Sequence, residues 1–214
     1  MAVDAVIWDF GGVITSSPFE AFRRFEKEQG LPEDLIRTIN STNPDTNAWA
    51  LFERSEIGID DFDKLFAEEA AARGHDVRGR QIIELLSGDI RPSMVEALTR
   101  CKAQAKVGCI TNNVSAGEGA GMARSADKAA QVEEVMALFD HVIESSKLRI
   151  RKPDPRIYQI ACDAMGVDPQ NCVYLDDLGI NLKPAKALGM RTIKVIDADK
   201  ALEELEEAVG FPVR

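Results

Sequence analysis

Short runs of apolar, mostly branched residues recur along this chain and are separated mostly by segments long enough to form a helix. The runs lie at residues 5–8, 107–110, 141–143, 172–175 and 192–196. Buried runs of this length that alternate with helical segments are typical of a parallel β-sheet whose strands are joined by crossover helices. The sequence therefore predicts an α/β fold built on a doubly wound parallel sheet.

Helical periodicity marks several of the intervening segments. The clearest helix is predicted between Asp154, which is placed to cap it, and Gly166, which is placed to end it, with Pro155 in the first turn. A second helix is expected at about residues 91–104, and a third ends near Gly189. The glycine-rich stretch 115–130 is interpreted as a surface connection.

Residues 16–88 depart from the alternation of strand and helix. They show helical patterns at 19–29, 34–39, 48–54, 61–73 and 80–86, and they hold six of the nine phenylalanines. Apolar residues at helical spacing usually form a core, so we interpret them as a small bundle with its own core rather than as an aromatic substrate pocket. We predict a core domain of residues 1–15 and 89–214, and an all-helical domain, 16–88, inserted after the first strand.

The composition excludes several classes of protein. Hydrophobic residues make up 45% of the chain and charged residues 29%, which is typical of a globular protein. The net charge of −10 argues against nucleic-acid and anionic-membrane partners, because both require clustered lysine and arginine. Four cysteines without a CxxC pair and only two histidines argue against a zinc site. No signal peptide or membrane span is evident, and we expect a cytoplasmic protein.

Polar side chains stand where the predicted strands end, the edge at which parallel sheets bind ligands. A carboxylate followed by two glycines comes after the first run, and a hydroxyl and an amide come after the second. A lysine lies in a proline-rich loop after the third run, and two adjacent carboxylates follow the fourth. In chain order these residues are Asp9, Gly11, Gly12, Thr111, Asn112, Lys152, Asp176 and Asp177.

Taken singly, each of these residues has an ordinary structural explanation, such as a turn aspartate or a solvated lysine. Together they suit one chemistry. Adjacent carboxylates at the end of an apolar run repel one another, and a divalent cation removes that repulsion. One carboxylate can act as a covalent nucleophile toward phosphorus, while a lysine and a hydroxyl hold the phosphoryl oxygens. The set therefore predicts phosphoryl transfer through an aspartyl phosphate.

This combination resembles the haloacid dehalogenase-like superfamily, whose four motifs match Asp9, Thr111, Lys152 and the pair Asp176 and Asp177, in order. The segments KPDPRIY and YLDDLGINLKPAKALGMRTIKV are similar to the N-terminal phosphatase domain of soluble epoxide hydrolases and its free-standing bacterial relatives. The resemblance implies a Rossmann-like core with a small helical cap. It also implies a magnesium-dependent phosphatase that hydrolyses a small phosphate monoester, a sugar or lipid phosphate.

The resemblance further implies a role for each matching residue. Asp9 is expected to attack phosphorus, and Mg²⁺ to be bound by Asp9, Asp177 and the backbone carbonyl of Gly11, with Asp176 supporting the metal from its outer shell. The phosphoryl group is expected to contact Thr111, Asn112 and Lys152, and Lys152 is also expected to take part in catalysis. The helical insert is expected to close over the site and select the substrate.

Gly11 departs from the family pattern, because most phosphatases of this superfamily have a second aspartate there that protonates the leaving group. Its loss costs roughly 10²- to 10⁴-fold in rate. Three explanations follow: a slow enzyme, an ester that needs little protonation, such as an anomeric sugar phosphate, or a proton donor in the cap. Two other functions stay open, a metal-independent 2-haloacid dehalogenase and a non-catalytic binding protein. The pair Asp176 and Asp177 argues against the dehalogenase. The sequence does not indicate an oligomeric state.

Overall fold

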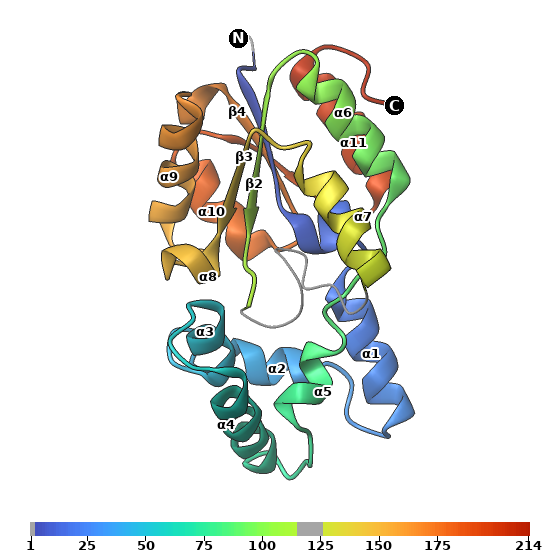
Figure 1. Cartoon of the computed structure of the whole chain (residues 1–214), viewed down its shortest axis with the longest axis vertical. Coiled ribbons are helices and arrows are strands. Elements are labelled where there is room, and N and C mark those ends of the chain that lie inside the picture. The colour runs from blue at the N-terminus through green and yellow to red at the C-terminus, as the bar shows by residue number, and fades with distance from the viewer. Residues whose placement is uncertain (1–2, 115–125) are drawn as a thin grey trace.

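A five-stranded parallel sheet forms the centre of the computed structural model, which describes residues 3–114 and 126–214 (Figure 1). The strand order is β3-β2-β1-β4-β5, and the strands are β1 (Ala5–Trp8), β2 (Lys106–Thr111), β3 (His141–Glu144), β4 (Cys172–Asp176) and β5 (Arg191–Lys194). The predicted α/β fold is confirmed. Most of the predicted surface connection at 115–130 lies outside the described residues.

The strand order reverses beside β1, which pairs with β2 on one side and with β4 on the other. The residues that follow these three strands therefore meet at one edge of the sheet. In a doubly wound sheet such a reversal opens a crevice at the carboxyl ends of the strands, where ligands bind. The topology thus places the ends of the first, second and fourth predicted strands side by side.

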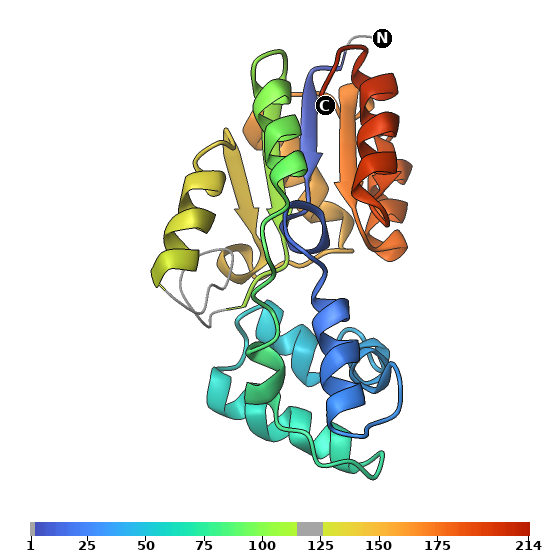
Figure 2. The same ribbon diagram turned by 90° about the vertical axis from the view of Figure 1, so that its right-hand side faces the viewer.

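Helices cover both faces of the sheet (Figure 2). Val6 and Trp8 of β1 point to the face covered by α6 (Pro92–Lys102), α7 (Ala126–Met136) and α11 (Ala198–Val209). Ala5 and Ile7 point to the opposite face, covered by α9 (Pro155–Met165) and α10 (Gly179–Ala187). Because side chains alternate along a strand and all four are fully buried, β1 is apolar on both faces.

The predicted helices of the core are present. The Asp154 side chain accepts a hydrogen bond from the Arg156 N–H at 2.9 Å and caps α9, which ends at Gly166 with φ of 62°. The other two predicted helices are α6 and α10. The sequence analysis did not predict α7, α11 or the single turn α8 (Ser145–Leu148). Within the described part of the chain, no helix is long and apolar enough to cross a membrane.

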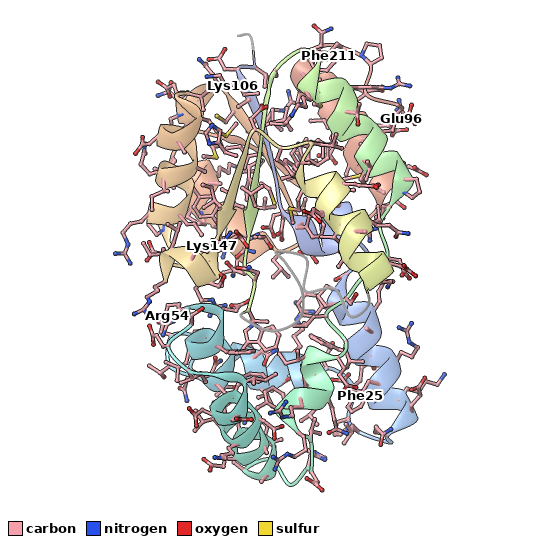
Figure 3. The ribbon with its side chains drawn as sticks, viewed as in Figure 1. Phe25, Arg54, Glu96, Lys106, Lys147 and Phe211 are labelled. Carbon is pink, nitrogen blue, oxygen red and sulfur yellow. The ribbon has the colours of Figure 1, made fainter. Side chains whose placement is uncertain are left out.

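The insert folds as five helices beyond the carboxyl edge of the sheet, and we call residues 16–88 the helical unit (Figure 1). All five predicted helical patterns are confirmed, as α1 (Pro18–Glu28), α2 (Leu35–Ser41), α3 (Ala48–Glu53), α4 (Ile59–Ala71) and α5 (Gly79–Ile83). The unit has its own apolar cluster. Figure 3 labels Phe25 on this unit, whereas Lys106 and Phe211 lie at the far end of the core.

Two adjacent chain segments connect the helical unit to the core. The Ser16 N–H donates to the Asp89 carbonyl at 2.8 Å, and the Asp89 N–H donates to Ser16 Oγ at 3.0 Å. Gly88 lies so close that an added Cβ would stand 2.6 Å from the Ser16 carbonyl oxygen. The predicted domain boundaries, between residues 15 and 16 and between 88 and 89, fall within these segments and stay a prediction.

Phe62 stands at the centre of the aromatic core of the helical unit. Its ring is fully buried, stacks on Phe52 with centroids 4.6 Å apart, and contacts Phe66 and Trp49 at 5.6 and 5.8 Å. We expect Phe62→Ala to lower the free energy of unfolding by about 3–5 kcal/mol, because it leaves a cavity that the neighbouring rings cannot fill.

Urea denaturation followed by circular dichroism measures this loss, with Phe25→Ala as the matched control. Phe25 is only partly buried at the edge of the same cluster, so its truncation should cost less. Equal losses in the two variants would contradict a central role for Phe62.

Candidate active site

The chain leaves β1 at Asp9 and enters a wide turn. The Asp9 N–H donates to the Leu175 carbonyl at 2.8 Å, which keeps Asp9 beside β4. Asp9 Oδ1 accepts a hydrogen bond from the Phe10 N–H at 2.7 Å, and the turn, Phe10–Ile14, closes with a bond from the Thr15 N–H to the Phe10 carbonyl at 3.0 Å. The backbone thus fixes Asp9 at the reversal point of the sheet.

Lys152 lies between two aspartates at the bottom of the site. Its side chain is 1% exposed, and Nζ lies 2.7 Å from Asp9 Oδ1 and 2.9 Å from Asp176 Oδ2. Asn112 positions the lysine, because its side chain accepts from the Lys152 N–H at 2.8 Å and donates to the Lys152 carbonyl at 3.0 Å. Among the described residues, no hydrogen bond engages Asp9 Oδ2, which leaves that oxygen available to a ligand.

The adjacent carboxylates of the fourth motif have different surroundings. Asp176 is fully buried and accepts hydrogen bonds from Tyr174 Oη, from the Leu178 N–H at 2.8 Å and from Asn181 Nδ2 at 3.1 Å, in addition to Lys152. Asp177 is partly exposed and accepts a hydrogen bond from Ser17 Oγ at 3.1 Å. Asp176 is therefore saturated by donors from the protein, whereas Asp177 has free acceptor capacity.

At Gly12 the backbone of the wide turn approaches the Asp177 side chain closely. Its φ is 81°, and an added Cβ would lie 2.3 Å from Asp177 Oδ2, so position 12 requires glycine for both its backbone angle and its contact. Gly11 has an ordinary φ of −70°, and an added Cβ there would meet no atom within 4 Å. Of the two adjacent glycines, only Gly12 is demanded by sterics.

The electrostatics of the site favour a divalent cation. Asp9, Asp176 and Asp177 offer oxygens that all lie within 4.8 Å of one another. Burial raises the pKa of Asp9 well above its usual range, with Lys152 opposing the rise and the other two carboxyls adding to it. Burial and the neighbouring Asp176 raise the pKa of Asp177 to about 6. Burial opposes the charge on Lys152, yet Asp176 and Asp9 raise its pKa above the usual value.

If all three carboxyls are ionised, the single lysine leaves two negative charges uncompensated. Mg²⁺ prefers carboxylate and carbonyl oxygens and brings the missing charge. The free Oδ2 of Asp9 and the available carboxylate of Asp177 fit such an ion, whereas the saturated Asp176 fits a supporting position behind it. The residues present are therefore suited to bind Mg²⁺.

A cavity of about 500 Å³ separates this edge of the sheet from the helical unit. That volume suits a small organic molecule. From the core, the predicted site residues Asp9, Gly11, Thr111, Asn112, Lys152 and Asp177 line it, while Asp176 stands outside the lining. The helical unit contributes apolar side chains, the polar Asn40 and Ser41, and the charged Arg37, Asp45 and Glu53. The structure thus brings together the predicted residues. Their roles as nucleophile, metal ligands and phosphate ligands stay predictions.

An ion pair that the sequence analysis missed joins the helical unit to the core. Arg151 Nε lies 2.7 Å from Glu53 Oε2, and Arg151 Nη1 donates to the Pro44 carbonyl at 2.9 Å. Ser145 Oγ donates to the Glu53 carbonyl at 2.9 Å. Burial raises the pKa of Glu53 despite the opposing charge of Arg151. The position of Arg151 directly before Lys152 was the only sequence signal for this contact.

Comparisons with known proteins assign this chain to one family of hydrolases. The model of the haloacid dehalogenase-like hydrolases matches residues 3–189. Acyl-CoA dehydrogenase family member 10 of Mus musculus is 32% identical over 98% of this chain, which spans only 19% of that protein. Bifunctional epoxide hydrolase 2 of Sus scrofa is 29% identical over 98% of this chain, which spans 39% of its length. Phosphatase MT3486 of Mycobacterium tuberculosis (strain CDC 1551 / Oshkosh) is 30% identical over 91% of this chain and 88% of its own length.

Solved structures share the fold. An enzyme of the haloacid dehalogenase family from Bacteroides thetaiotaomicron, in complex with magnesium and inorganic phosphate, superimposes with a TM-score of 0.59 at 20% identity, over 90% of this chain and 94% of that one. A dehalogenase with an intermediate complex superimposes with a TM-score of 0.67 at 18% identity, over 97% of both chains. At these identities the likeness concerns the fold alone.

The two glycines of the wide turn should respond differently to substitution. We expect Gly12→Ala to lower the free energy of unfolding by about 1–2 kcal/mol for the left-handed backbone alone, and by more because Asp177 must move. Gly11→Ala is the matched control and should change it by less than about 1 kcal/mol, because its backbone angle is ordinary and its surroundings are open. Thermal or urea denaturation of both variants measures the difference. Similar losses in the two would contradict the contact between Gly12 and Asp177.

Proposed function

The chain belongs to the haloacid dehalogenase-like hydrolases, and we propose that it is a magnesium-dependent phosphatase that uses Asp9 as its nucleophile. The observation that carries the proposal is the cluster of three carboxylates around buried Lys152, with a free oxygen on Asp9. Phosphoryl transfer needs a nucleophile, a fixed cation and a divalent metal at one place. Two similar proteins carry the word phosphatase in their names, which supports the same assignment.

The residues suggest how each would act. Asp9, Asp177 and the carbonyl of Gly11 would hold Mg²⁺, supported by Asp176, and the bound metal would offset the repulsion between the nucleophile and a phosphate dianion. Asp9 attacks phosphorus with one of its carboxylate oxygens, and the bond from phosphorus to the ester oxygen breaks. Lys152 contacts the phosphoryl oxygens and lowers the cost of their negative charge.

Thr111 lines the cavity at the end of β2. In this proposal its hydroxyl donates to the same phosphoryl group. The departing alkoxide takes its proton from water, because position 11 lacks a carboxyl. A second water then attacks phosphorus in the aspartyl phosphate and gives its proton to the hydroxide left by the first step. The bond from phosphorus to the Asp9 oxygen breaks, inorganic phosphate leaves, and the Asp9 carboxylate is restored. The main role of Asn112 in this proposal is to position Lys152, because both polar atoms of its side-chain amide form hydrogen bonds to the lysine backbone.

The helical unit is proposed to act as the cap that selects a small phosphorylated substrate, a sugar or lipid phosphate. It supplies most of the apolar wall of the cavity and meets the core at the loop that carries Lys152. Apolar walls with a few fixed polar groups are typical of small-molecule sites.

A metal-independent 2-haloacid dehalogenase is the second candidate. Gly11 favours it, because halide is a leaving group that needs no proton. The fold is also shared with a solved dehalogenase. The pair Asp176 and Asp177 argues against it, since a reaction without metal has no use for an extra partly exposed carboxylate beside the nucleophile.

The nucleophile is tested by phosphate release from an activated aryl phosphate and from a panel of sugar and lipid phosphates. We expect release to require Mg²⁺ and to fall by roughly 10³-fold or more in Asp9→Asn, as expected for the loss of a covalent nucleophile. Asp61→Asn, on an exposed face of α4, is the matched control and should retain activity. Full activity without metal, or halide release from a 2-haloacid without metal, would contradict the phosphatase.

The open space at position 11 allows a test of the missing general acid. We expect Gly11→Asp to raise the turnover of alkyl phosphates by about 10²-fold, because a carboxyl there can protonate the leaving alkoxide. Aryl phosphates, whose leaving groups need little protonation, should gain much less. Gly11→Asn has the same size without the proton and should give no such gain. Equal effects of Asp and Asn, or of alkyl and aryl esters, would exclude proton donation.

A further inference from the structure

Among the residues that the structure describes, three cationic side chains line the cavity, and two of them already have carboxylate partners. Lys152 pairs with Asp9 and Asp176, and Arg151 pairs with Glu53 at 2.7 Å. The third is Arg37 of α2, on the wall formed by the helical unit. Within residues 3–114 and 126–214, no carboxylate forms an ion pair with Arg37. Its charge is therefore available to a ligand.

Arg37 is held at the cavity wall by an aromatic ring. Its guanidinium carbon lies 5.5 Å from the centroid of the Phe19 ring, and Phe19 lines the same cavity. A cation over a ring face gains about 0.5–1 kcal/mol at an exposed site, enough to favour one orientation without consuming the N–H donors. The guanidinium can still form two parallel hydrogen bonds to a carboxylate or phosphate.

The other arginines of the helical unit that could serve a ligand are placed differently. Arg54 forms an ion pair with Glu56 at 2.7 Å and donates to the Asp45 carbonyl at 3.0 Å, and it does not line the cavity. Arg23 and Arg24 are exposed on α1, also outside the lining. Arg37 is thus distinguished from them by its position and not by its residue type.

We infer that Arg37 binds a second anionic group of the substrate, so that the substrate is a phosphate monoester with a carboxylate or further phosphate at its far end. This inference rests on the proposed phosphatase function. The phosphoryl group would bind at Asp9 and Lys152, and the second anion would bind at Arg37. The part between them would contact an apolar wall made of Phe19, Phe22, Trp49, Leu86 and Val114.

The charges of the cavity support the assignment of the second anionic group to Arg37. The helical unit also contributes two carboxyls to the cavity lining, of which Glu53 pairs with Arg151, and Asp45 forms no ion pair with Arg37 in the described part of the chain. They therefore leave the positive charge of Arg37 uncancelled. A substrate with an uncharged tail would leave that charge unused, whereas a dianionic tail or a carboxylate would gain a charge-assisted pair of hydrogen bonds.

The test compares Mg²⁺-dependent hydrolysis of phenyl phosphate with that of aryl phosphates that carry a para carboxylate directly or on a spacer of one or two methylenes. We expect the wild-type protein to prefer the carboxylate of best-fitting length by about 10-fold in kcat/KM, mainly through KM. Arg37→Gln should abolish the preference, so that phenyl phosphate and the carboxylated esters are hydrolysed with similar kcat/KM. Arg37→Glu should instead prefer an aryl phosphate with an aminomethyl group. Arg23→Gln is the matched control and should behave as the wild type.

The outcomes separate this inference from the function on which it rests. Hydrolysis of phenyl phosphate by the wild type and by Arg37→Gln, with the same carboxylate preference in both or in neither, would overturn the role of Arg37 while keeping the phosphatase. Failure of every protein to release phosphate from any of these esters would overturn the phosphatase itself, and the inference with it. Loss of the preference in Arg37→Gln together with its inversion in Arg37→Glu supports the inference.

Discussion

The site depends on a buried ammonium group held between two carboxylates. An unpaired lysine costs several kcal/mol at a position as buried as that of Lys152, so its charge is tolerated only because Asp9 and Asp176 both contact it. Those aspartates follow β1 and end β4, which are neighbours in the sheet. Asn112, after β2, fixes the lysine backbone. The ion triad therefore depends on β1 and β4 being neighbours, and two of its members, Asp9 and Lys152, line the cavity.

The same triad explains why two adjacent aspartates differ. Asp176 donates nothing and accepts from four groups of the protein, which stabilise its charge as a fixed part of the fold. Asp177 has one hydroxyl donor, and burial together with the neighbouring Asp176 raises its pKa to about 6. One lysine can neutralise only part of this cluster. The remaining negative charge suits the small, hard cation that the proposed function requires, and it disfavours an anion without one.

The sheet and its polar edge could be predicted because both depend on local patterns. Apolar runs of strand length and polar residues at their ends identify the elements, and parallel strands bring those ends to one side. The strand order could not be read in this way, since an apolar run does not specify its neighbours. The same reason hid the contact of Glu53 with Arg151, and the sequence could not separate Arg37 from Arg23, Arg24 and Arg54, because these positions depend on how the helical unit packs on the core. For Asn112, the predicted contact with phosphate competes with two hydrogen bonds to Lys152 that only the fold reveals.

The two adjacent glycines of the wide turn differ in whether the fold requires a glycine at their position. A side chain at position 12 would collide with Asp177 and would have to adopt a left-handed backbone, so folding alone explains Gly12. No such constraint applies at position 11, where the backbone is ordinary and the space is open to the cavity. The lack of a carboxyl beside Asp9 is therefore not a consequence of packing. Under the proposed phosphatase function its explanation is chemical: slow turnover, an ester whose leaving group needs little protonation, or a proton donor in the cap.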